Sequence, residues 1–358
     1  MKISILLPYK ENFSIEKSGA VSLFVNDIIK NGHDKNSFTV YGKTDEKKFL
    51  DKSYINLNFT NNLLRSNSNI YINKFLEYEK KISSDIIEIH NRPAYVKKIK
   101  KNISSKIILY FHNDPLSMNG SKSIKDREDL ILNVDHFIFN SKWSLSRFKI
   151  GLSNADFHKV KFSVVYQSVN KPRINFNKKK NLISFIGKLN RAKGYDIFGE
   201  AIVKILNKYP NWKSIVIGDE PREKHFFYHK NLIQLGYKNH GFILKKLEIT
   251  SISVICSTWN EPLGRASLEA CSRGSVPIIT NKGGLPETSS SAKIINNLNV
   301  KNLFTEIENL ILNKKLLQKL QLKNYKEFKF TPNLISKKID QIRKSILLEK
   351  NINILKNK

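Results

Sequence analysis

Residues 257–287 read STWNEPLGRASLEACSRGSVPIITNKGGLPE, and this stretch decides the expected fold around it. A strand-like apolar run, Ile252 to Cys256, precedes Glu261-Pro262, and Glu269 follows eight residues after Glu261. Proline is favoured at the first position of a helix, because its missing N–H would be unsatisfied there in any case. The sequence therefore predicts a strand followed by a helix that begins at Pro262.

The predicted helix start indicates a ligand site. It would leave the backbone amides of Leu263, Gly264 and Arg265 unpaired, and unpaired amides at the positive end of a helix dipole attract phosphate. Gly264 has no Cβ, so a ligand can come close to the backbone. Glu261 and Glu269 would repel phosphate but accept hydrogen bonds from the hydroxyls of a sugar and a ribose. This combination predicts a site for a nucleotide sugar.

The two glutamates do not fit a hydrolase. On an ideal helix, eight residues separate Glu261 and Glu269 by about 12 Å along the axis. A pair of carboxylates acting on one glycosidic bond needs about 5–9.5 Å. A double-carboxylate hydrolytic site is therefore disfavoured.

The same stretch resembles a known family. The motif combines spaced glutamates and glycines: Glu261-Pro262-x-Gly264-x4-Glu269-Ala270, Gly274-x-x-Pro277 and Gly283-Gly284-x-x-Glu287. It resembles the donor-binding signature of the retaining GT-B glycosyltransferases of family 4, the glycosyl transferases group 1. FIGKLNRAKGYDIFGEAI, Phe185 to Ile202, is similar to a second block of that family. The resemblance implies an α/β GT-B fold, with two Rossmann-like, doubly wound parallel-sheet domains facing across a cleft and a C-terminal helix crossing back.

The resemblance implies a donor site in the second half of the chain. Lys193 matches the phosphate-binding lysine of the family. Glu261 matches the residue on the donor-sugar hydroxyls, and Glu269 the residue on the ribose. Gly187 is the glycine of the upstream block. The family usually has arginine directly after it, where this chain has Lys188. The donor-binding residues implied in this half are Gly187, Lys188, Arg191, Leu263, Gly264, Arg265 and Glu269, with Arg191 supplying the second charge.

The first half carries weaker matches. Ser18-Gly19-Ala20 resembles a degenerate form of the family's Gly-Gly loop, so Gly19 is expected near the donor phosphates. His112 ends a predicted strand and resembles the family's cleft histidine, which we expect to act in catalysis with Lys193 and Glu261. His90 and Asn91 end the preceding strand in the same way and are expected to face the acceptor.

The resemblance implies an activity. The expected reaction is retaining transfer from a nucleotide diphosphate sugar to a hydroxyl of a cell-envelope glycan or glycolipid, such as a lipopolysaccharide, capsule or polyprenyl-linked saccharide. The chain contains no Asp-x-Asp metal signature. We therefore expect metal-independent chemistry with no cofactor. A sugar-nucleotide epimerase of the same fold and a basic nucleic-acid-binding protein are the alternatives, although no zinc-finger or RNA-binding signature is present and no nucleic-acid partner is expected.

Alternation of strands and helices predicts mostly parallel sheets. Strand candidates lie at 2–7, 37–41, 85–90, 106–112, 136–140, 161–166, 181–186, 213–218, 232–236, 251–256, 276–280 and 292–295. Helical patterns in the first half lie near 20–31, 70–82, 94–102, 122–132 and 141–150. A polar, charged stretch from Asn170 to Lys180 predicts a linker. We expect domains at 1–172 and 173–330, and a C-terminal helix at 331–358.

The C-terminal segment has apolar residues at helical spacing: Leu334, Ile335, Ile339, Ile342 and Ile346. This pattern predicts a helix. We expect it to pack back on the first domain. An amphipathic helix on a membrane surface is the alternative, because the polar face carries several lysines and arginines.

The chain is strongly basic, with 62 Lys and Arg against 31 Asp and Glu, a net charge of +31. The excess is divided evenly between the two halves. It is consistent with attraction to an anionic membrane and equally with a compositional bias on solvated faces. The helical stretch from Tyr95 to Asn102 is the densest basic cluster of the first half, and either a solvated face or an anionic surface fits it.

Apolar runs of five or six residues are too short to cross a bilayer, and the N-terminal run is too short for a secretory signal. Cys256 and Cys271 read as buried thiols. The predicted location is the cytoplasm, with peripheral contact to the inner face of the cytoplasmic membrane.

Overall fold

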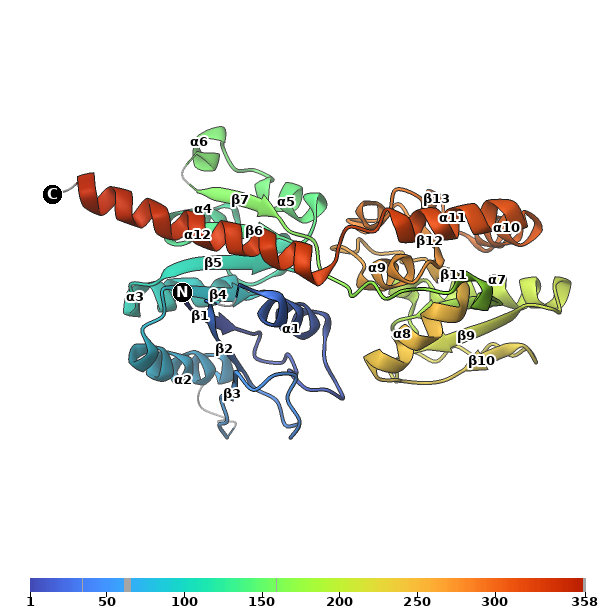
Figure 1. The fold of residues 1–358 in the computed structure, drawn as a ribbon, viewed down its shortest axis with the longest axis horizontal. Coiled ribbons are helices and arrows are strands. Elements are labelled where there is room, and N and C mark those ends of the chain that lie inside the picture. The colour runs from blue at the N-terminus through green and yellow to red at the C-terminus, as the bar shows by residue number, and fades with distance from the viewer. Residues whose placement is uncertain (34, 61–65, 159, 357–358) are drawn as a thin grey trace. The chain divides into compact units, whose positions relative to one another are not determined.

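The computed structural model describes residues 1–33, 35–60, 66–158 and 160–356. The chain divides into two compact units (Figure 1). Unit 1 consists of residues 1–168 and 332–358, and unit 2 of residues 169–331.

Unit 1 contains a seven-stranded parallel sheet in the order β3-β2-β1-β4-β5-β6-β7. Its strands are β1 (Lys2–Leu6), β2 (Ser37–Gly42), β3 (Tyr54–Asn56), β4 (Ile86–His90), β5 (Lys106–Phe111), β6 (His136–Phe139) and β7 (Lys161–Val164). Its α-helices are α1 (Ala20–Asn31), α2 (Asn67–Ile82), α3 (Val96–Asn102), α4 (Ile124–Asn133), α5 (Lys142–Lys149), α6 (Asn154–Phe157) and α12 (Pro332–Lys356), with 3₁₀ helices at Pro93–Tyr95 and Pro115–Ser117.

Two apolar clusters cover the faces of this sheet. Alternate residues of a strand point to opposite faces, so Ile86 and Ile108 pack with α1 and α12, whereas Ile87 and Leu109 pack with α2, α3 and α4. The central strands are buried on both sides, as expected of a parallel sheet covered by helices.

Unit 2 contains a six-stranded parallel sheet in the order β10-β9-β8-β11-β12-β13. Its strands are β8 (Lys180–Ile186), β9 (Lys213–Ile217), β10 (Leu232–Gln234), β11 (Thr250–Ile255), β12 (Val276–Thr280) and β13 (Lys293–Ile295). Its α-helices are α7 (Tyr195–Lys208), α8 (His240–Ile249), α9 (Arg265–Ser272), α10 (Val300–Leu312) and α11 (Lys314–Lys326), with 3₁₀ helices at Phe176–Lys178, Arg191–Lys193 and Leu285–Thr288.

Each sheet has a point at which the strand order reverses. In unit 2 the reversal lies between β8 and β11, and in unit 1 between β1 and β4. Ligands of open α/β folds bind at the carboxyl ends of the strands that flank such a point. The loops after β8 and β11 are therefore where a ligand site of unit 2 is expected.

The predicted α/β class with two parallel sheets is confirmed. Strand β3 was not predicted, because three residues are too few for a recognisable period. The predicted helix start at Pro262 is wrong, since α9 begins at Arg265. Gly264 has a φ of 103°, a left-handed conformation that a helix cannot continue through. Glu261 therefore lies in a loop before the helix, and the separation of about 12 Å inferred from helix geometry has no basis.

Helix α12 packs within unit 1. Ile335, Ile339, Ile342 and Ile346 are buried in the cluster shared with α1, whereas Leu334, which we expected in the same stripe, is 57% exposed. None of the helices in the described part of the chain has the length and apolar content that crossing a bilayer requires.

A buried ion pair joins α12 to the sheet. The Arg343 guanidinium donates from Nε and Nη2 to the two carboxylate oxygens of Glu88 on β4, each at 2.8 Å, and both side chains have no exposed surface. Arg343 Nη1 also donates to Asp340, and the Tyr110 hydroxyl donates to Glu88. The neighbouring carboxylate of Glu88 raises the pKa of Arg343 despite its burial. The Arg343 guanidinium therefore stays charged at neutral pH although it is buried.

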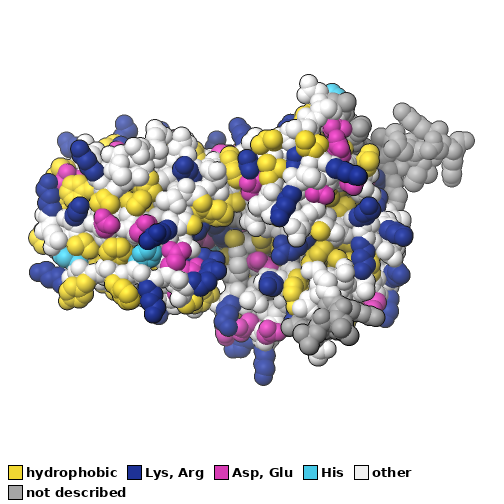
Figure 2. All heavy atoms as spheres, turned by 180° about the vertical axis from the view of Figure 1, so that it is seen from behind, with side chains coloured by type: hydrophobic (Ala, Val, Ile, Leu, Met, Phe, Trp, Pro, Cys, Tyr) yellow, Lys and Arg dark blue, Asp and Glu magenta, His cyan; other side chains and the backbone are white. Residues whose placement is uncertain are grey.

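Lysine and arginine side chains are scattered over the visible face of each unit, among apolar and acidic ones (Figure 2). This distribution agrees with the even division of charge between the halves of the sequence. On this face the basic side chains do not gather into one patch.

Candidate active site

The turn after β8 brings the upstream motif to the strand-order reversal of unit 2. Asn190 accepts from the amide of Lys193 at 3.0 Å and so caps the 3₁₀ helix Arg191–Lys193. Gly194 follows with a φ of 70°, and a Cβ there would overlap the carbonyl oxygen of Cys256 at the end of β11. The amide of Thr258 donates to Ala192 O at 3.0 Å. These contacts dock the lysine-bearing turn onto the residues that follow β11.

This docking brings Lys193 and Glu261 into contact. Lys193 Nζ forms an ion pair with Glu261 Oε1. The same oxygen accepts from Ser257 Oγ at 2.5 Å and from Trp259 Nε1 at 2.9 Å, and the ammonium lies 5.2 Å from the centroid of the Trp259 ring. The other oxygen, Glu261 Oε2, has no hydrogen-bond partner within the described ranges. The Glu261 carboxylate is thus held in place through one oxygen and can accept from a ligand hydroxyl through the other.

The loop after Glu261 is shaped by two glycines. Gly283 has a φ of 62° and pairs with Glu261 in a parallel bridge, and a Cβ there would overlap the Glu261 carbonyl. A Cβ at Gly264 would overlap the buried Leu285. The amides of Leu263 and Gly264 donate to no group among the residues that the structure describes. Two free amides therefore lie in the loop between Glu261 and the start of α9.

Glu269 lies on α9 in a second cluster. Its Oε1 accepts from His240 Nε2 at 2.8 Å and from Arg265 Nε at 2.9 Å. Burial alone would raise the pKa of Glu269, but the His240 hydrogen bond and the Arg265 charge hold this pKa below its ordinary value. The carboxylate is therefore ionised at neutral pH and can accept hydrogen bonds from ligand hydroxyls.

The remaining predicted donor residues lie around the same turn. Gly187 has a φ of 152°, and a Cβ there would meet no atom within 4 Å, so the space above it is open. Lys188 and Arg191 are exposed, and neither side chain has a partner among the described residues. Their charges are available to an anionic ligand.

In unit 1, His90 and His112 lie side by side. His90 Nδ1 is 2.9 Å from His112 Nε2, and the ring planes differ by 10°. Asn91, with a φ of 53°, accepts through Oδ1 from the amides of His112 and Asn113. His90 has no exposed surface and Asn91 is 4% exposed. Both residues therefore hold His112 in place, and their predicted contact with the acceptor stays a prediction.

Gly19 precedes helix α1, where a phosphate was expected. Glu11 Oε1 accepts from the amide of Ser22 at 3.0 Å, and a Cβ at Gly19 would overlap that carboxylate. A protein carboxylate thus already occupies the start of α1. Gly19 lies close to the Glu11 carboxylate, and its predicted place near the donor phosphates stays a prediction.

Sequence reasoning missed several residues of these clusters. Ser257 and Trp259 stand inside the stretch that was singled out, but their contacts with Glu261 depend on the loop conformation. Asn190 follows the predicted strand in a typical capping position and could have been identified. His240 is 29 residues from Glu269 and carries no local signal.

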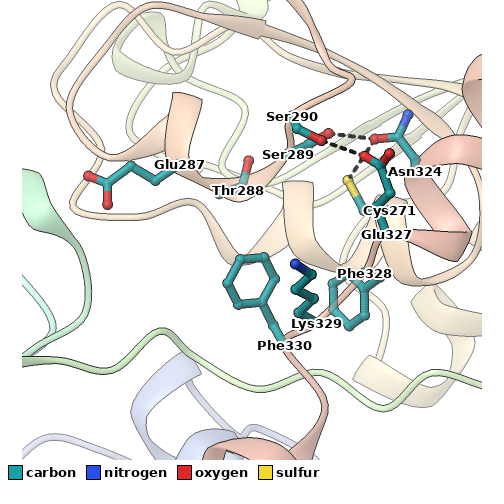
Figure 3. Close-up of a pocket in the computed structure, with 10 residues that line it drawn as sticks. All are labelled: Cys271, Glu287, Thr288, Ser289, Ser290, Asn324, Glu327, Phe328, Lys329 and Phe330. Atoms are coloured by element: carbon teal, nitrogen blue, oxygen red, sulfur yellow. Dashed lines mark hydrogen bonds between the residues drawn. The ribbon is translucent and has the colours of Figure 1, made fainter.

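A separate cavity of about 370 Å³ lies elsewhere in unit 2 (Figure 3). It is lined by Cys271, Glu287, Thr288, Ser289, Ser290, Asn324, Glu327, Phe328, Lys329 and Phe330. Glu287 points away from the other lining side chains (Figure 3). The cavity contains neither Lys193 nor Glu261. Hydrogen bonds from Ser289 to Asn324 and from Ser290 to Glu327 hold its wall together.

Metal ligands are not gathered in the described part of either unit. Across the described ranges, no three side chains among His, Cys, Asp and Glu lie close enough to hold an ion. Both cysteines, Cys256 and Cys271, are buried free thiols, as predicted.

Comparison with known proteins finds a family match for the second unit. A family model described as "Glycosyl transferases group 1" matches residues 167–327. The putative glycosyltransferase YtcC of Bacillus subtilis is 26% identical over 308 residues, covering 75% of this chain and 74% of that protein. The spore coat protein SA of the same organism is 24% identical over 332 residues, covering 82% and 84%.

A solved structure resembles the whole chain. The HepE protein of Anabaena, in complex with UDP-glucose, is similar with a TM-score of 0.75 and 17% identity, covering 96% of this chain and 100% of that one. At this identity the similarity establishes the GT-B fold.

Proposed function

We propose that this chain, whose second unit matches the group 1 glycosyltransferase family model, transfers a sugar, with retention of configuration, from a nucleotide diphosphate sugar to a hydroxyl of a cell-envelope glycan or glycolipid. The observation that carries the proposal is the Lys193–Glu261 contact beside the free amides of Leu263 and Gly264. A cation, an acid and two unpaired donors meet at the strand-order reversal of unit 2, where α/β folds bind ligands.

In this proposal the diphosphate is bound by the two amides and by Lys193. Lys193 Nζ then exchanges Glu261 for a phosphate oxygen. At an effective dielectric constant of about 20, a cation about 4 Å from a phosphate charge interacts with it by roughly 4 kcal/mol. Only the part of this interaction that grows as the leaving diphosphate gains charge accelerates transfer.

Glu261 and Glu269 would hold the two ends of the donor. Glu261, fixed through Oε1 by Ser257 and Trp259, offers Oε2 to hydroxyls of the sugar. Glu269, oriented by His240 and Arg265, is placed to accept from the ribose. The exposed Lys188 and Arg191 would add charge beside the phosphates. UDP-glucose in the HepE structure supports a nucleotide sugar as the donor class.

The chemistry that we propose needs no metal and no cofactor, because Lys193 and the free amides supply the charge that the leaving diphosphate requires. As in related enzymes, the leaving phosphate would help to deprotonate the acceptor hydroxyl. We place the enzyme in the cytoplasm, at the inner face of the cytoplasmic membrane, where lipid-linked acceptors are made.

The test is a pair of charge-removing substitutions. Lys193→Met and Glu261→Gln should each lower donor turnover by at least about 100-fold, roughly 2.7 kcal/mol of transition-state stabilisation. The release of nucleoside diphosphate measures turnover, and unchanged thermal melts show intact folding. Lys204→Met, which removes an exposed lysine of α7 without described side-chain contacts, is the matched control and should stay active. Full activity of both site variants would exclude this assignment.

The donor is identified by thermal stabilisation with uridine, guanosine and adenosine diphosphates. Stabilisation by one base over the others would name the nucleotide, and Lys193→Met should weaken that response.

A further inference from the structure

Residues 222–230, which follow β9 in unit 2, form a segment in which exposed and partly buried residues strictly alternate. Residues 222, 224, 226, 228 and 230 are exposed, and residues 223, 225, 227 and 229 are partly buried. Alternation with period two means that one edge of the segment faces the protein and the other faces solvent. Arg222 is already paired with Glu220. The unpaired outward side chains are Lys224, Phe226, Tyr228 and Lys230, here called the exposed strip.

The inward side chains fix this segment to the rest of unit 2. Glu223 accepts from the amide of Arg191 at 2.9 Å. The Phe227 ring packs edge-on against Tyr195, with ring centroids 5.6 Å apart, and fills the space that a Cβ at Gly199 would need. Gln234 Nε2 donates to Phe227 O at 2.9 Å. The exposed strip is therefore held outward by partly buried anchors.

The two aromatic rings of the strip protrude. Phe226 is 86% exposed and Tyr228 is 90% exposed, the highest values among the large apolar side chains of the described residues. Two neighbouring exposed rings leave apolar surface in contact with water, which is energetically unfavourable. Exposed apolar patches on folded proteins therefore often mark interaction sites. Rings that line a groove are partly covered by its walls, whereas these two rings are almost fully exposed. They are therefore better suited to insert into an apolar phase than to line a binding groove.

The charges around the rings indicate that this apolar phase is a lipid bilayer. Lys224 and Lys230 flank the rings, and no acidic residue lies on the outward side of the segment. Aromatic side chains favour the headgroup level of a bilayer, and lysines near the surface are attracted to anionic lipids. A protruding apolar centre with cationic ends combines the two terms by which proteins bind a bilayer surface.

We propose that the exposed strip is a membrane anchor, which inserts Phe226 and Tyr228 between lipid headgroups while Lys224 and Lys230 contact anionic phosphates. This inference deepens the proposed function, because it places a lipid contact on the same unit as the donor site and on a segment bonded to Arg191. Its test measures binding to lipid without any turnover, so that its failure and the failure of the proposed function are distinguishable.

The experiment is co-sedimentation of the full chain with vesicles of phosphatidylcholine alone and of phosphatidylcholine mixed with phosphatidylglycerol. Phe226→Ser with Tyr228→Ser should weaken binding to the acidic vesicles by about tenfold or more, because about 1.4 kcal/mol or more of apolar transfer is lost. Lys224→Gln with Lys230→Gln should weaken it by a similar factor at low salt. The matched controls are Leu312→Ser with Leu322→Ser, and Lys204→Gln with Lys245→Gln, which change exposed side chains outside the strip.

Binding of the strip variants at the wild-type level would overturn the proposal, as would an equal loss in the control lysine pair. A protein that binds neither kind of vesicle would overturn it too. If the strip variants lose retention on double-stranded DNA and keep vesicle binding, the strip is a polyanion site and the membrane assignment is wrong. Loss of transfer together with intact vesicle binding would reject the proposed function and leave the anchor standing.

Discussion

Nδ1 of His90 lies 2.9 Å from Nε2 of His112, and the two rings are stacked in the core of unit 1. Two neutral rings can share only one hydrogen between these nitrogens, so the tautomer of one ring fixes that of the other. The outer nitrogens, His90 Nε2 and His112 Nδ1, are buried without a partner among the described residues. Whether His112 offers a donor or an acceptor at Nδ1 is therefore set by His90.

Removing the shared hydrogen bond should cost stability and activity. His90→Leu leaves His112 Nε2 buried and unsatisfied, which we expect to lower the free energy of unfolding by about 1–3 kcal/mol. It should also reduce the rate of transfer, because the tautomer of His112 is no longer fixed. Urea unfolding and turnover measure the two effects. His90→Asn places an amide near the position of Nδ1 and should recover part of both. Equal behaviour of the two variants would show that the hydrogen bond has no such role.

The same pair should make unit 1 sensitive to acid. Burial lowers the pKa of His112 to about 3, and burial with the nearby His112 lowers the pKa of His90 well below its ordinary value. In the unfolded chain both titrate near 6.5. Between pH 6.5 and about 3 the unfolded state binds more protons, so stability falls as the pH falls, by up to about 1.4 kcal/mol per pH unit for each histidine.

Urea midpoints at pH 7 and pH 5 check this expectation. The double variant His90→Phe, His112→Phe should depend less on pH than the wild type across this interval. Parallel pH profiles for the two proteins would contradict the assignment of the acid sensitivity to this pair. Above pH 6.5 the histidine contribution is constant, so the difference between the profiles should appear only below that value.

Gly194 should tolerate no side chain. Its φ of 70° is left-handed, and a Cβ would overlap the carbonyl oxygen of Cys256. Gly194→Ala should destabilise the protein by about 3 kcal/mol or more, since backbone at both sides of the contact has to move. Gly236→Ala is the control, because Gly236 has a similar φ of 64° with no atom within 4 Å of its Cβ. It should lose only the conformational term of about 1–2 kcal/mol. If both variants lost a similar amount of stability in thermal melts, the close approach of Gly194 to Cys256 would not be the reason that glycine is needed there.

The ion pair between Arg343 and Glu88 should be sensitive to removal of one partner. Arg343→Met leaves the Glu88 carboxylate buried without its counter-charge, which typically costs about 3–5 kcal/mol. Adding Glu88→Gln removes that charge and should restore most of the loss. Chemical unfolding of the two single variants and the double variant gives the coupling between them. Additive losses would show that the two side chains act independently.

Much of the architecture followed from local patterns, because alternating strands and helices with apolar periods leave few topologies other than parallel sheets. The positions of Gly187, Lys193 and Glu261 in the loops after β8 and β11 could be predicted from the family resemblance of their two motif blocks. The contact between Lys193 and Glu261 could not, since it depends on Gly194 fitting under the Cys256 carbonyl, 62 residues along the chain. The start of α9 was misplaced because Pro262 favours a helix, whereas the bridge between Glu261 and Gly283 holds the chain extended until Gly264 turns it.

The amide of Val169 donates to the carbonyl of Phe330 at 2.8 Å, so the chain enters and leaves unit 2 at adjacent points. Unit 2 is therefore an insertion within unit 1, and the last helix of unit 1 is translated after all of it. Ile335, Ile339 and Ile342 cover apolar surface of the first sheet, and on the ribosome that surface stays open until residue 342 has been made. A nascent chain would therefore complete unit 2 before unit 1, and the incomplete unit 1 would stay exposed to chaperones until α12 is made.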